Sequence, residues 1–526
     1  MFGKTIIQAF LVLLTGGFWI ASMPPFNLGE LGYILFVPLL LWVYTKPSWR
    51  AVLWVAGLSS LIAWVGILIW LRHVTSIGTI LLAGCLALYF IVWLSYVRWV
   101  LPRLLHQSFP FRLLGFLGIA GTWVVCEWLR SILIYGMPMG PLALTQWQKP
   151  VMLQVAAWTG AYGVSFFLIF FNCCMAQTFF NLSVSDKKRS IFLRWFKADF
   201  YCALALLISL IFLYLNCLPK SWSNQGESFS FALVQPNFPP LLDWDADYNA
   251  LRLVQLEQEI LRAQLLEFDI LMLPEAVTPD AIIGDRETLL FYESLIENQA
   301  QPILTGNTAY FSEGDRWYNG IFLMEPETGL NPLYYAKQRL VPFGEYVPQP
   351  FQGLLEAFGA TQGYYYPGTF NGIIPIHLRE RHYAFGALIC YEDMFPALAR
   401  NRVRAGADIL YVATNNAWYG EEGGAYFHAA HSVLRAVENR RPIIRCGNAG
   451  WSGWIDAYGS IRNVLTDETN SIYFRGSGSF TLTNHKQWQS FTSVYTRYGD
   501  WFVGLSAILS LVASLIREKR SNPYLI

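Results

Sequence analysis

Residues 268–275 of the chain read Phe-Asp-Ile-Leu-Met-Leu-Pro-Glu, a short apolar run that ends in a proline and an acid. A run of this length with a proline stop predicts a buried β-strand that places Glu275 at its end. Similar runs recur along the C-terminal half, where they alternate with segments of helical spacing such as 246–266. Strands that alternate with helices predict an α/β layered domain whose reactive groups gather beyond the carboxyl ends of the strands.

The other elements of this half follow from the same two periodicities. A short apolar run predicts a strand, and apolar residues three and four apart predict a helix. Further strands are predicted at 229–236, 302–310, 317–325, 332–337, 382–390, 408–414, 442–447 and 451–456. Further helices are predicted near 287–299, 395–405 and 426–438.

The charged residues divide the chain of 526 residues into two unlike halves. Only 14% of the residues are charged and 54% are apolar, whereas a soluble globular chain carries about 25% charge. Residues 1–217 hold 14 Lys and Arg with 4 Asp and Glu, against 23 and 32 in residues 218–526. This division excludes a single soluble domain, a disordered chain and a fibrous repeat, and it predicts a membrane half joined to a half that folds in water. The net charge of +1 gives no footprint for nucleic-acid binding.

Eight apolar runs are candidates for transmembrane helices, each of which needs roughly 20 mostly apolar residues. The second run is short, so the count is about eight, or seven if this run does not span. The first run lacks a small-residue cleavage site before Pro24 and is expected to remain as an anchor rather than to be a signal peptide. The runs are 5–22, 31–45, 51–71, 77–97, 113–134, 160–181, 199–217 and 501–516.

Two charged residues, Glu127 and Arg130, interrupt the fifth run. A charge inside an apolar run is costly if it is unpaired, and residues three apart lie on one face of a helix. We expect either a structural ion pair at the outer end of this helix or contact with a substrate headgroup.

The basic residues of the connecting segments predict the orientation of the chain. With a cytoplasmic N-terminus, the inside segments carry 14 Lys and Arg, and the short outside loops carry 3, namely Arg72, Arg130 and Lys149. We therefore expect a membrane domain with seven helices at 1–217, an extracytoplasmic domain at 218–500, and a last helix with a cytoplasmic tail at 501–526. In a bacterium, this places a multi-pass protein in the inner membrane, with its soluble domain in the periplasm and both termini in the cytoplasm.

Three segments place reactive side chains at the ends of predicted strands. They deliver Glu275, Lys337 at the head of Lys337-Gln-Arg-Leu-Val-Pro-Phe-Gly-Glu345-Tyr-Val-Pro, and Cys390 in Ile-Cys390-Tyr-Glu392. A cysteine that leaves a strand is held near backbone N–H groups, a carboxylate can take its proton, and a lysine can lower its pKa and stabilise an oxyanion. Each residue alone is more often structural or a solvated charge. Together they predict a site with a nucleophilic cysteine.

With these motifs the chain resembles the apolipoprotein N-acyltransferases, the membrane-bound branch of the nitrilase (carbon–nitrogen hydrolase) superfamily. The resemblance implies a helical membrane domain joined to an α/β nitrilase-like αββα sandwich, with a catalytic triad of Glu275, Lys337 and Cys390. In the soluble half it rests on Leu-Pro-Glu275, the string that starts at Lys337, Ile-Cys390-Tyr-Glu392 and Arg435-Ala-Val-Glu-Asn-Arg-Arg-Pro. In the membrane half it rests on Glu127-Trp-Leu-Arg130 and Gly160-Ala-Tyr-Gly-Val-Ser.

The resemblance also implies a two-step acyl transfer without a cofactor or metal. Glu275 would deprotonate Cys390, the thiolate would attack an ester of a membrane phospholipid, and Lys337 would stabilise the oxyanion that leads to a thioester. The acceptor would be the α-amino group of the diacylglyceryl cysteine of an apolipoprotein, in lipoprotein biosynthesis. The implied partners are therefore a phospholipid, a diacylated apolipoprotein and the bilayer, but no nucleic acid, and the enzyme is expected to be a monomer.

Five further residues have supporting roles that the resemblance implies. Glu345 would hold Lys337 or the site network, Tyr391 and Glu392 flank the nucleophile, and Asn319 lies on a neighbouring strand. Trp418 would lie on a loop beside the site. The alternatives are a turn residue for Asn319, a packing residue for Trp418 and a surface acid for Glu345.

Three stretches leave details of the substrate open. Asn416 stands where many members of the family have Asp, and residues 445–454 differ from their Thr-Asn-Thr-Gly pattern, although both departures spare the triad. Residues 351–370 are apolar and aromatic, which is typical either of a membrane-facing arm that gates lipid entry or of ordinary core.

The histidines and cysteines of the soluble half carry signals of other kinds of site. His428 and His431 have neither a third ligand nor a His-Glu-x-x-His pattern, so no metal site is expected. Cys390 and Cys446 could form a disulfide, although we expect Cys390 to stay reduced. The alternative functions are a membrane-anchored amidase or nitrilase that hydrolyses a small C–N substrate, and a transporter with a non-catalytic soluble domain.

Overall fold

The chain folds into two compact units. The computed structural model describes residues 2–133, 135–184, 197–217, 227–240, 246–297, 299–349, 351, 365–484, 488 and 491–518. Residues 1–220 and 498–526 form a helical unit, and residues 221–497 form an α/β unit. The sequence places these boundaries close by, after residues 217 and 500. The membrane-facing arm expected at 351–370 falls mainly on residues 352–364, which lie outside the described residues.

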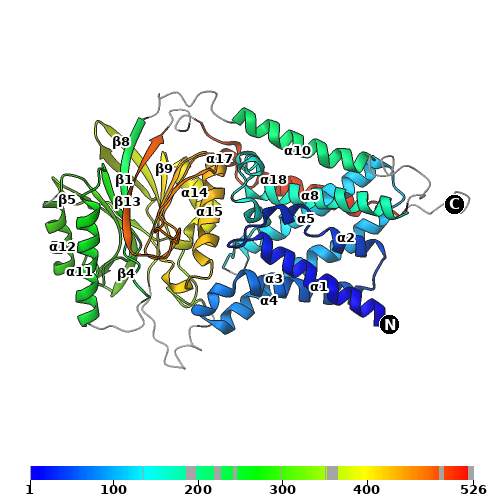
Figure 1. Ribbon diagram of the computed structural model, residues 1–526, viewed down its shortest axis with the longest axis horizontal. Coiled ribbons are helices and arrows are strands. Elements are labelled where there is room, and N and C mark those ends of the chain that lie inside the picture. Colours follow the sequence, from blue (N-terminus) through cyan, green and yellow to red (C-terminus); the bar gives the residue numbers. More distant parts are fainter. Residues whose placement is uncertain are drawn as a thin grey trace, which may run out of the picture. The chain divides into compact units, whose positions relative to one another are not determined.

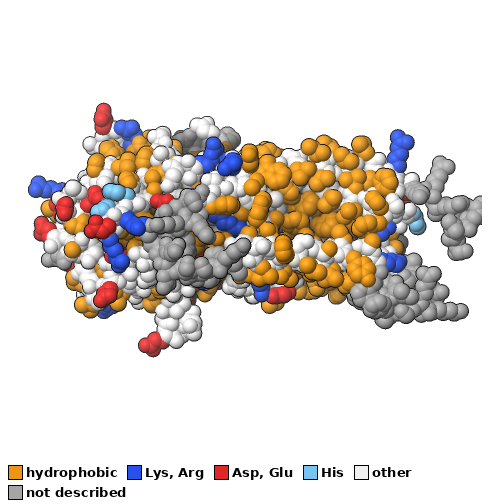
Figure 2. Space-filling model, turned by 90° about the horizontal axis from the view of Figure 1, so that it is seen from above, with side chains coloured by type: hydrophobic (Ala, Val, Ile, Leu, Met, Phe, Trp, Pro, Cys, Tyr) orange, Lys and Arg blue, Asp and Glu red, His pale blue; other side chains and the backbone are white. Residues whose placement is uncertain are grey.

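The helical unit is built from apolar helices (Figure 1). Six of them are long and apolar enough to cross a membrane among the residues described. Hydrophobic side chains cover the face of this unit seen in Figure 2, as expected of a surface that contacts lipid. The long helices are α1 (Phe2–Ser22), α3 (Trp49–Ile67), α4 (Ser76–Val100), α5 (Phe109–Ile132), α8 (Ala161–Val184) and α10 (Ala198–Cys217). The short ones are α2 (Val37–Tyr44), α6 (Pro150–Leu153), α7 (Ala156–Thr159) and α18 (Trp501–Ser514).

The expected count of about eight spanning helices is not confirmed, because the described residues contain six helices of sufficient length. Two of the eight predicted runs form shorter apolar helical segments, Gly29–Tyr44 and Trp501–Ser514. The first of these begins as a five-residue 3-10 turn (Gly29–Tyr33) and continues as the eight-residue helix α2. At 1.5 Å per residue, α2 is about 12 Å long, well short of a hydrocarbon core of about 30 Å.

Glu127 and Arg130 do not form the ion pair that was one of their two predicted roles. The Glu127 Oε1 atom instead accepts hydrogen bonds from Trp123 Nε1 and from the Leu142 backbone N–H, both at 2.7 Å. The Arg130 guanidinium lies 5.1 Å from the centroid of the Trp64 ring, in a cation–π contact. The two charges are thus held separately inside the helical unit, within the part of the chain that is described.

The α/β unit contains two β-sheets. Four strands that the sequence did not predict lie at sheet edges, namely β5 (Gly329–Leu330), β7 (Ile373–Leu378), β12 (Ile461–Val464) and β13 (Gly476–Asn484). The seven-stranded sheet has the order β13-β1-β2-β3-β4-β5, with β6 paired to β4, and the six-stranded sheet has the order β12-β11-β10-β9-β8-β7. The strands are β1 (Glu227–Gln235), β2 (Ile270–Leu273), β3 (Ile303–Phe311), β4 (Arg316–Glu325), β5 (Gly329–Leu330), β6 (Tyr335–Ala336), β7 (Ile373–Leu378), β8 (Arg381–Ile389), β9 (Ile409–Thr414), β10 (Ile443–Gly447), β11 (Gly453–Ile455), β12 (Ile461–Val464) and β13 (Gly476–Asn484).

The two sheets pack face to face and helices cover their outer faces, which confirms the predicted αββα sandwich (Figure 1). The layer between the sheets joins residues such as Phe231 and Met272 to Phe385 and Ile409. Helices α11 (Ala246–Ala263) and α12 (Arg286–Glu297) bury Leu256 and other apolar side chains against the seven-stranded sheet. Helices α14 (Pro396–Arg404) and α15 (Gly424–Asn439) contact the six-stranded sheet at β8 and β10. A short helix, α17 (Val494–Tyr498), follows.

The strand directions bring several carboxyl ends together. Strands β1, β2 and β3 are parallel neighbours, and so are β8, β9 and β10. Strand β6 is antiparallel to β4, which is itself antiparallel to β3, so β6 runs in the direction of β3. Within the seven-stranded sheet the carboxyl ends of β2 and β6 therefore lie at one edge, and within the six-stranded sheet those of β8 and β9 do the same. Hydrogen bonds between the segments that follow these strands join the two edges into a single site.

Candidate active site

Cys390 is the first residue of a tight turn that leaves strand β8. The turn, η5 (Cys390–Met394), is a short 3-10 helix, and Cys390 itself has a φ of +52°. A left-handed conformation costs a residue other than glycine about 1–2 kcal/mol, so the surrounding contacts must hold Cys390 in place. Its side chain is only 6% exposed. The sequence expectation that this cysteine leaves a strand into a turn is thus met, but the thiol is more buried than an exposed turn implies.

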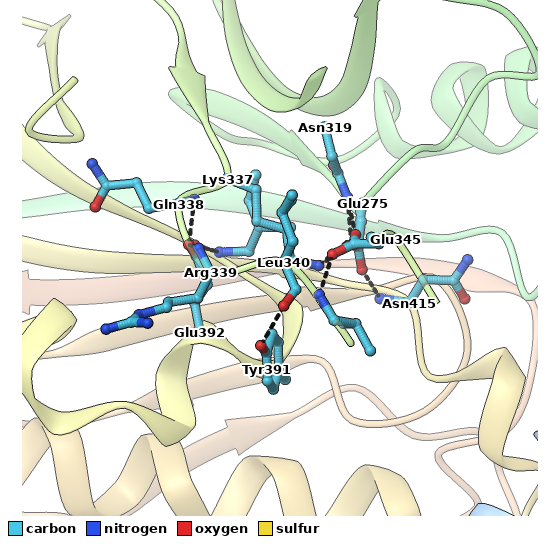
Figure 3. A network of polar contacts seen from close by, with 12 residues as sticks. Glu275, Asn319, Lys337, Gln338, Arg339, Leu340, Glu345, Tyr391, Glu392 and Asn415 are labelled. Carbon is cyan, nitrogen blue, oxygen red and sulfur yellow. Dashed lines mark hydrogen bonds and ion pairs between the residues drawn. The ribbon is translucent and has the colours of Figure 1, made fainter. Parts of the chain in front are cut away.

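Glu275 follows strand β2 and Pro274 and is held by hydrogen bonds to both carboxylate oxygens. Its Oε1 accepts a 2.8 Å hydrogen bond from Asn319 Nδ2 on β4, and its Oε2 accepts a 2.9 Å bond from the Asn415 backbone N–H. Figure 3 shows Glu275 between the Asn319 side chain and the backbone of Asn415. Glu275 is 7% exposed, so this carboxylate lies inside the unit with its orientation fixed.

Lys337 follows strand β6 and lies between two carboxylates. Its Nζ is 2.8 Å from Glu345 Oε1 and 3.3 Å from Glu275 Oε1, and the side chain is fully buried. Burial alone would lower the pKa of Lys337, but the charges of Glu345 and Glu275 outweigh it and hold this pKa well above its usual value. Lys337 is therefore a fixed positive charge at neutral pH.

Glu345 is not the surface acid that the sequence left open. Its Oε1 contacts Lys337 and accepts a 3.2 Å bond from Asn319 Nδ2, while its Oε2 accepts a 2.8 Å bond from the Val341 backbone N–H. Asn319 likewise lies within a strand rather than a turn, and its amide bridges Glu275 and Glu345. The two residues position Lys337 and Glu275 relative to one another.

Charge and burial act together on the Cys390 thiol. Burial raises the pKa of Cys390 to about 12, the negative charge of Glu275 adds to this rise, and the positive charge of Lys337 opposes it. With its pKa raised this far, the thiol is protonated at pH 7. The site therefore holds a neutral thiol that needs a base as it reacts, and the charges of Glu275, Lys337 and, more weakly, Glu345 act on it.

Glu392 fixes the turn of Cys390 to the segment that follows Lys337. Its Oε1 accepts hydrogen bonds from the backbone N–H groups of Gln338 and Arg339 at 2.7 and 2.9 Å, and its Oε2 accepts one from the Ile389 N–H at 2.8 Å. The Tyr335 hydroxyl donates to the same carboxylate at 2.8 Å. This fully buried acid thus ties the nucleophile to the lysine (Figure 3).

Tyr391 contacts the same segment, the residues that follow strand β6. Its hydroxyl donates a 2.6 Å hydrogen bond to the Leu340 carbonyl oxygen, and its ring centroid lies 5.7 Å from Lys337 Nζ. Burial raises the pKa of Tyr391 above the range in which it could titrate under ordinary conditions, so the hydroxyl stays a donor. Tyr391 therefore flanks the nucleophile through packing and a backbone contact.

A second set of buried charges anchors the turn to α15 and β10. Asp393 Oδ2 pairs with Arg445 and accepts a 2.6 Å bond from Ser432 Oγ, and Arg445 Nη1 donates to the same hydroxyl at 2.8 Å. Arg435 Nη1 donates to the Met394 carbonyl oxygen at 3.1 Å. Arg445 belongs to the stretch 445–454 that departs from the family pattern. Its contact with Asp393, three residues after Cys390, shows that this stretch helps to hold the turn of the nucleophile.

Trp418 lies on the 3-10 turn Ala417–Tyr419 that follows strand β9, and 43% of its surface is exposed. The structure therefore places Trp418 on a loop, as predicted, and does not bury it as a packing residue. The next residue, Tyr419, lies near Cys390 and Glu275. Burial first, and then the nearby Cys390 and Glu275, hold the pKa of Tyr419 well above its usual value. Asn416 is 1% exposed beneath this turn.

Sequence reasoning missed two groups that hold the site. The Asn415 backbone N–H carries no side-chain signal, although its place directly after a buried strand was the available hint. Tyr335 lies two residues before Lys337, on the same face of β6, and its hydroxyl also accepts a 2.8 Å bond from Arg402 Nη2. A pattern of polar residues cannot reveal either role, because both depend on contacts between distant strands.

His428, His431 and Cys446, the other candidate reactive residues of the sequence, are packed in the interior of the α/β unit. His428 and His431 are fully buried on α15, where their rings contact Tyr419 at 5.1 Å and Phe427 at 5.4 Å. Over the residues described, no three His, Cys, Asp or Glu side chains gather as a metal site would require. Cys446 lies in the core between the two sheets, and both it and Cys390 are free thiols.

Comparison with known proteins finds similarity over both units. The family described as the apolipoprotein N-acyltransferase N-terminal domain matches residues 15–174, and the carbon–nitrogen hydrolase family matches residues 230–480. The apolipoprotein N-acyltransferase of Geobacter metallireducens is 29% identical over 97% of this chain and 95% of its own length. That of Thermotoga maritima is 26% identical over 99% and 95%. Among solved structures, Saccharomyces cerevisiae Nit3, a member of branch 10 of the nitrilase superfamily, covers 51% of this chain and 94% of its own at 18% identity, with a TM-score of 0.37.

Proposed function

Because the chain belongs to the apolipoprotein N-acyltransferase family, within the carbon–nitrogen hydrolases, we propose that it moves one fatty acyl chain from a membrane phospholipid to an apolipoprotein. The acceptor is the α-amino group of the diacylglyceryl cysteine at the N-terminus of that apolipoprotein. The observation that carries this proposal is the buried set of Glu275, Lys337 and Cys390 in a chain whose described residues also include six helices long and apolar enough to span a membrane.

The first half of the reaction loads the enzyme. As the Cys390 Sγ atom attacks the ester carbonyl carbon, Glu275 takes the thiol proton, and Lys337 stabilises the negative charge that develops on the carbonyl oxygen. The tetrahedral intermediate collapses, the ester C–O bond breaks, and Glu275 returns the proton to the leaving lysophospholipid alkoxide. The product is an acyl thioester on Cys390, with Glu275 again a carboxylate and Lys337 still an ammonium.

The second half transfers the chain to the amine. The α-amino nitrogen of the acceptor attacks the thioester carbon, Glu275 takes a proton from this nitrogen, and Lys337 again stabilises the oxyanion. The C–S bond breaks and the sulfur recovers the proton from Glu275, which leaves an amide on the apolipoprotein. Burial of Cys390 supports this order, because a thioester shielded from water survives until the amine arrives.

An acyl-transfer assay tests the proposal. Purified full-length protein, phospholipid and a synthetic peptide that begins with S-diacylglyceryl cysteine should yield a peptide heavier by one acyl chain and an equal amount of lysophospholipid, both measured by mass spectrometry. The matched control is the same peptide with an acetylated α-amino group, which should gain nothing. Release of ammonia from small amides without transfer would support the amidase alternative, and release of free fatty acid alone would also contradict the proposal.

We also propose that the α/β unit is periplasmic, that both termini are cytoplasmic, and that the protein is a monomer in the inner membrane of a bacterium. The 14 basic residues on the proposed inside segments, against 3 on the outside loops, support this orientation. Protease added to intact spheroplasts should therefore degrade residues 218–500 and leave an epitope tag after residue 526 untouched. Protection of the α/β unit until the membrane is lysed would contradict the orientation.

A further inference from the structure

An apolar groove lies between helices α3 and α4 of the helical unit. It has a volume of about 480 Å³ and is lined by α3 from Arg50 to Leu61 and by α4 from Gly84 to Ile91. Leu53 and Leu58 on its α3 wall are 48% and 43% exposed, so the groove is open along its side. This surface belongs to two of the helices long enough to span a membrane, so acyl chains rather than water are its natural solvent.

Two glycines create the hollow. A Cβ atom added at Gly84 would meet no atom within 4 Å, and one added at Gly57 would meet only Ile91 Cδ1 at an ordinary 3.7 Å. Glycine in the interior of a helix costs about 1 kcal/mol relative to alanine, and neither position needs it for backbone conformation or close helix packing. The missing side chains leave room for something that is not part of the described chain.

The length of the groove matches one leaflet of a bilayer. The α3 wall runs over the 12 residues from Arg50 to Leu61, and the 11 steps between them, at 1.5 Å each, span about 16 Å. Half of a hydrocarbon core of about 30 Å is about 15 Å. A single acyl chain of one leaflet therefore fits along the wall, with its headgroup end at Arg50.

Arg50 supplies a charge at that end. Its guanidinium is exposed and has no hydrogen-bond or ion-pair partner among the described residues. The neighbouring basic side chains are already engaged, since Lys46 pairs with Glu518 and Arg98 Nε donates to the Pro47 carbonyl oxygen at 2.8 Å. Arg50 also lies in the first turn of α3, where the helix dipole favours an anion.

We propose that this groove binds one anionic glycerophospholipid, with its phosphate at Arg50 and an acyl chain along α3 and α4. On the orientation proposed above, this lipid lies in the cytoplasmic leaflet and is separate from the acyl donor. Its binding is noncovalent and depends only on the helical unit. The proposal can therefore fail while acyl transfer holds, and the reverse is equally true.

Native mass spectrometry of the full chain in detergent tests the site. The protein carries Cys390→Ala so that no acyl thioester can form, and it is titrated with phosphatidylglycerol or with phosphatidylcholine. We expect one phosphatidylglycerol to bind at least fivefold more tightly than phosphatidylcholine. Arg50→Ala should weaken the binding of phosphatidylglycerol about tenfold and remove the preference, because a charge-assisted contact is lost.

Two filling variants and one control give the experiment its specificity. Gly84→Leu and, as a second variant, Gly57→Leu place a side chain in the groove and should weaken the binding of both lipids at least tenfold. Gly17→Leu on α1 also adds a side chain where no atom lies within 4 Å, but outside the groove, and should bind as the parent does. Thermal midpoints establish that the variants are folded. Unchanged binding in both filling variants, or the conversion of a dimer to a monomer by either, would overturn the proposal.

Discussion

Replacement of Cys390 by alanine is expected to abolish both the acyl adduct and acyl transfer. The Sγ atom forms the covalent bond that divides the reaction into two steps, and no other described group of the site can replace it. Removal of a covalent nucleophile costs about 10⁴-fold or more in kcat/KM. Incubation with phospholipid should therefore leave a fatty-acyl mass on the Cys390 peptide of the parent protein, lost on hydroxylamine treatment, and none on the variant.

The matched control for this prediction is Cys446→Ala. Cys446 is also a buried free thiol of the α/β unit, and its Sγ contacts the carbonyl oxygens of Val234 and Met272 at 3.5 and 3.3 Å in the core between the sheets. We expect this variant to keep its adduct and most of its activity, with a loss of about 1 kcal/mol in stability from the small cavity. An adduct that persists in Cys390→Ala, or that disappears in Cys446→Ala, would refute the assignment of the nucleophile.

Most of the α/β fold could be predicted from apolar runs. The strands that could not be predicted lie at sheet edges, and this position explains why their sequences lack the signal. Strands β2 and β9 are fully buried, and β8 is buried from Phe385 to Ile389, so these stretches read as apolar runs. The edge strand β13 contains Gly476, Ser477 and Gly478, and the edge strand β7 contains Pro375. Edge strands tolerate such residues because one side makes no ladder hydrogen bonds, and the same residues remove the signal on which prediction depends.

In the helical unit, apolar composition predicts where the helical segments lie but not how long each helix is. An apolar run predicts that a segment avoids water but does not set the length of its helix. Residues 31–45 are apolar throughout, yet the chain there forms a 3-10 turn followed by the short helix α2. Hydropathy therefore located eight apolar segments, whereas only local backbone geometry decides which of them are long enough to span.

The candidate site could be predicted in part because its main side chains end strands. Glu275, Lys337 and Cys390 each follow a strand directly or after one proline. Glu275 and Lys337 follow strands of one sheet and Cys390 follows a strand of the other, so the site forms where the carboxyl ends of the two packed sheets meet. The hydrogen-bond network around these three side chains could not be predicted from the sequence. The Glu392 carboxylate is held by three backbone N–H groups from two separate segments, and backbone donors leave no trace in the amino-acid sequence.

Replacement of Glu275 by glutamine is expected to move two properties of the site in opposite directions. Loss of the general base should lower acyl transfer by about 10²–10⁴-fold. The negative charge of Glu275 also raises the pKa of the Cys390 thiol, so its removal should lower that pKa and increase the thiolate fraction at a given pH. Alkylation of Cys390 by iodoacetamide between pH 7 and 10 should rise about tenfold per pH unit in the parent, because these values lie below a pKa of about 12. In Glu275→Gln the same rates should appear at lower pH.

Lys337→Met is the matched partner of this variant, because it removes a charge of the opposite sign from the same site. The positive charge of Lys337 lowers the pKa of Cys390, so its loss should displace the alkylation profile to higher pH while acyl transfer also falls. A purely structural disturbance would move the profiles of both variants in the same direction. Opposite displacements with a shared loss of transfer therefore separate the base from the electrostatic partner. A Glu275→Gln protein that transfers acyl chains at the parent rate, or whose profile moves to higher pH, would contradict the role proposed for Glu275.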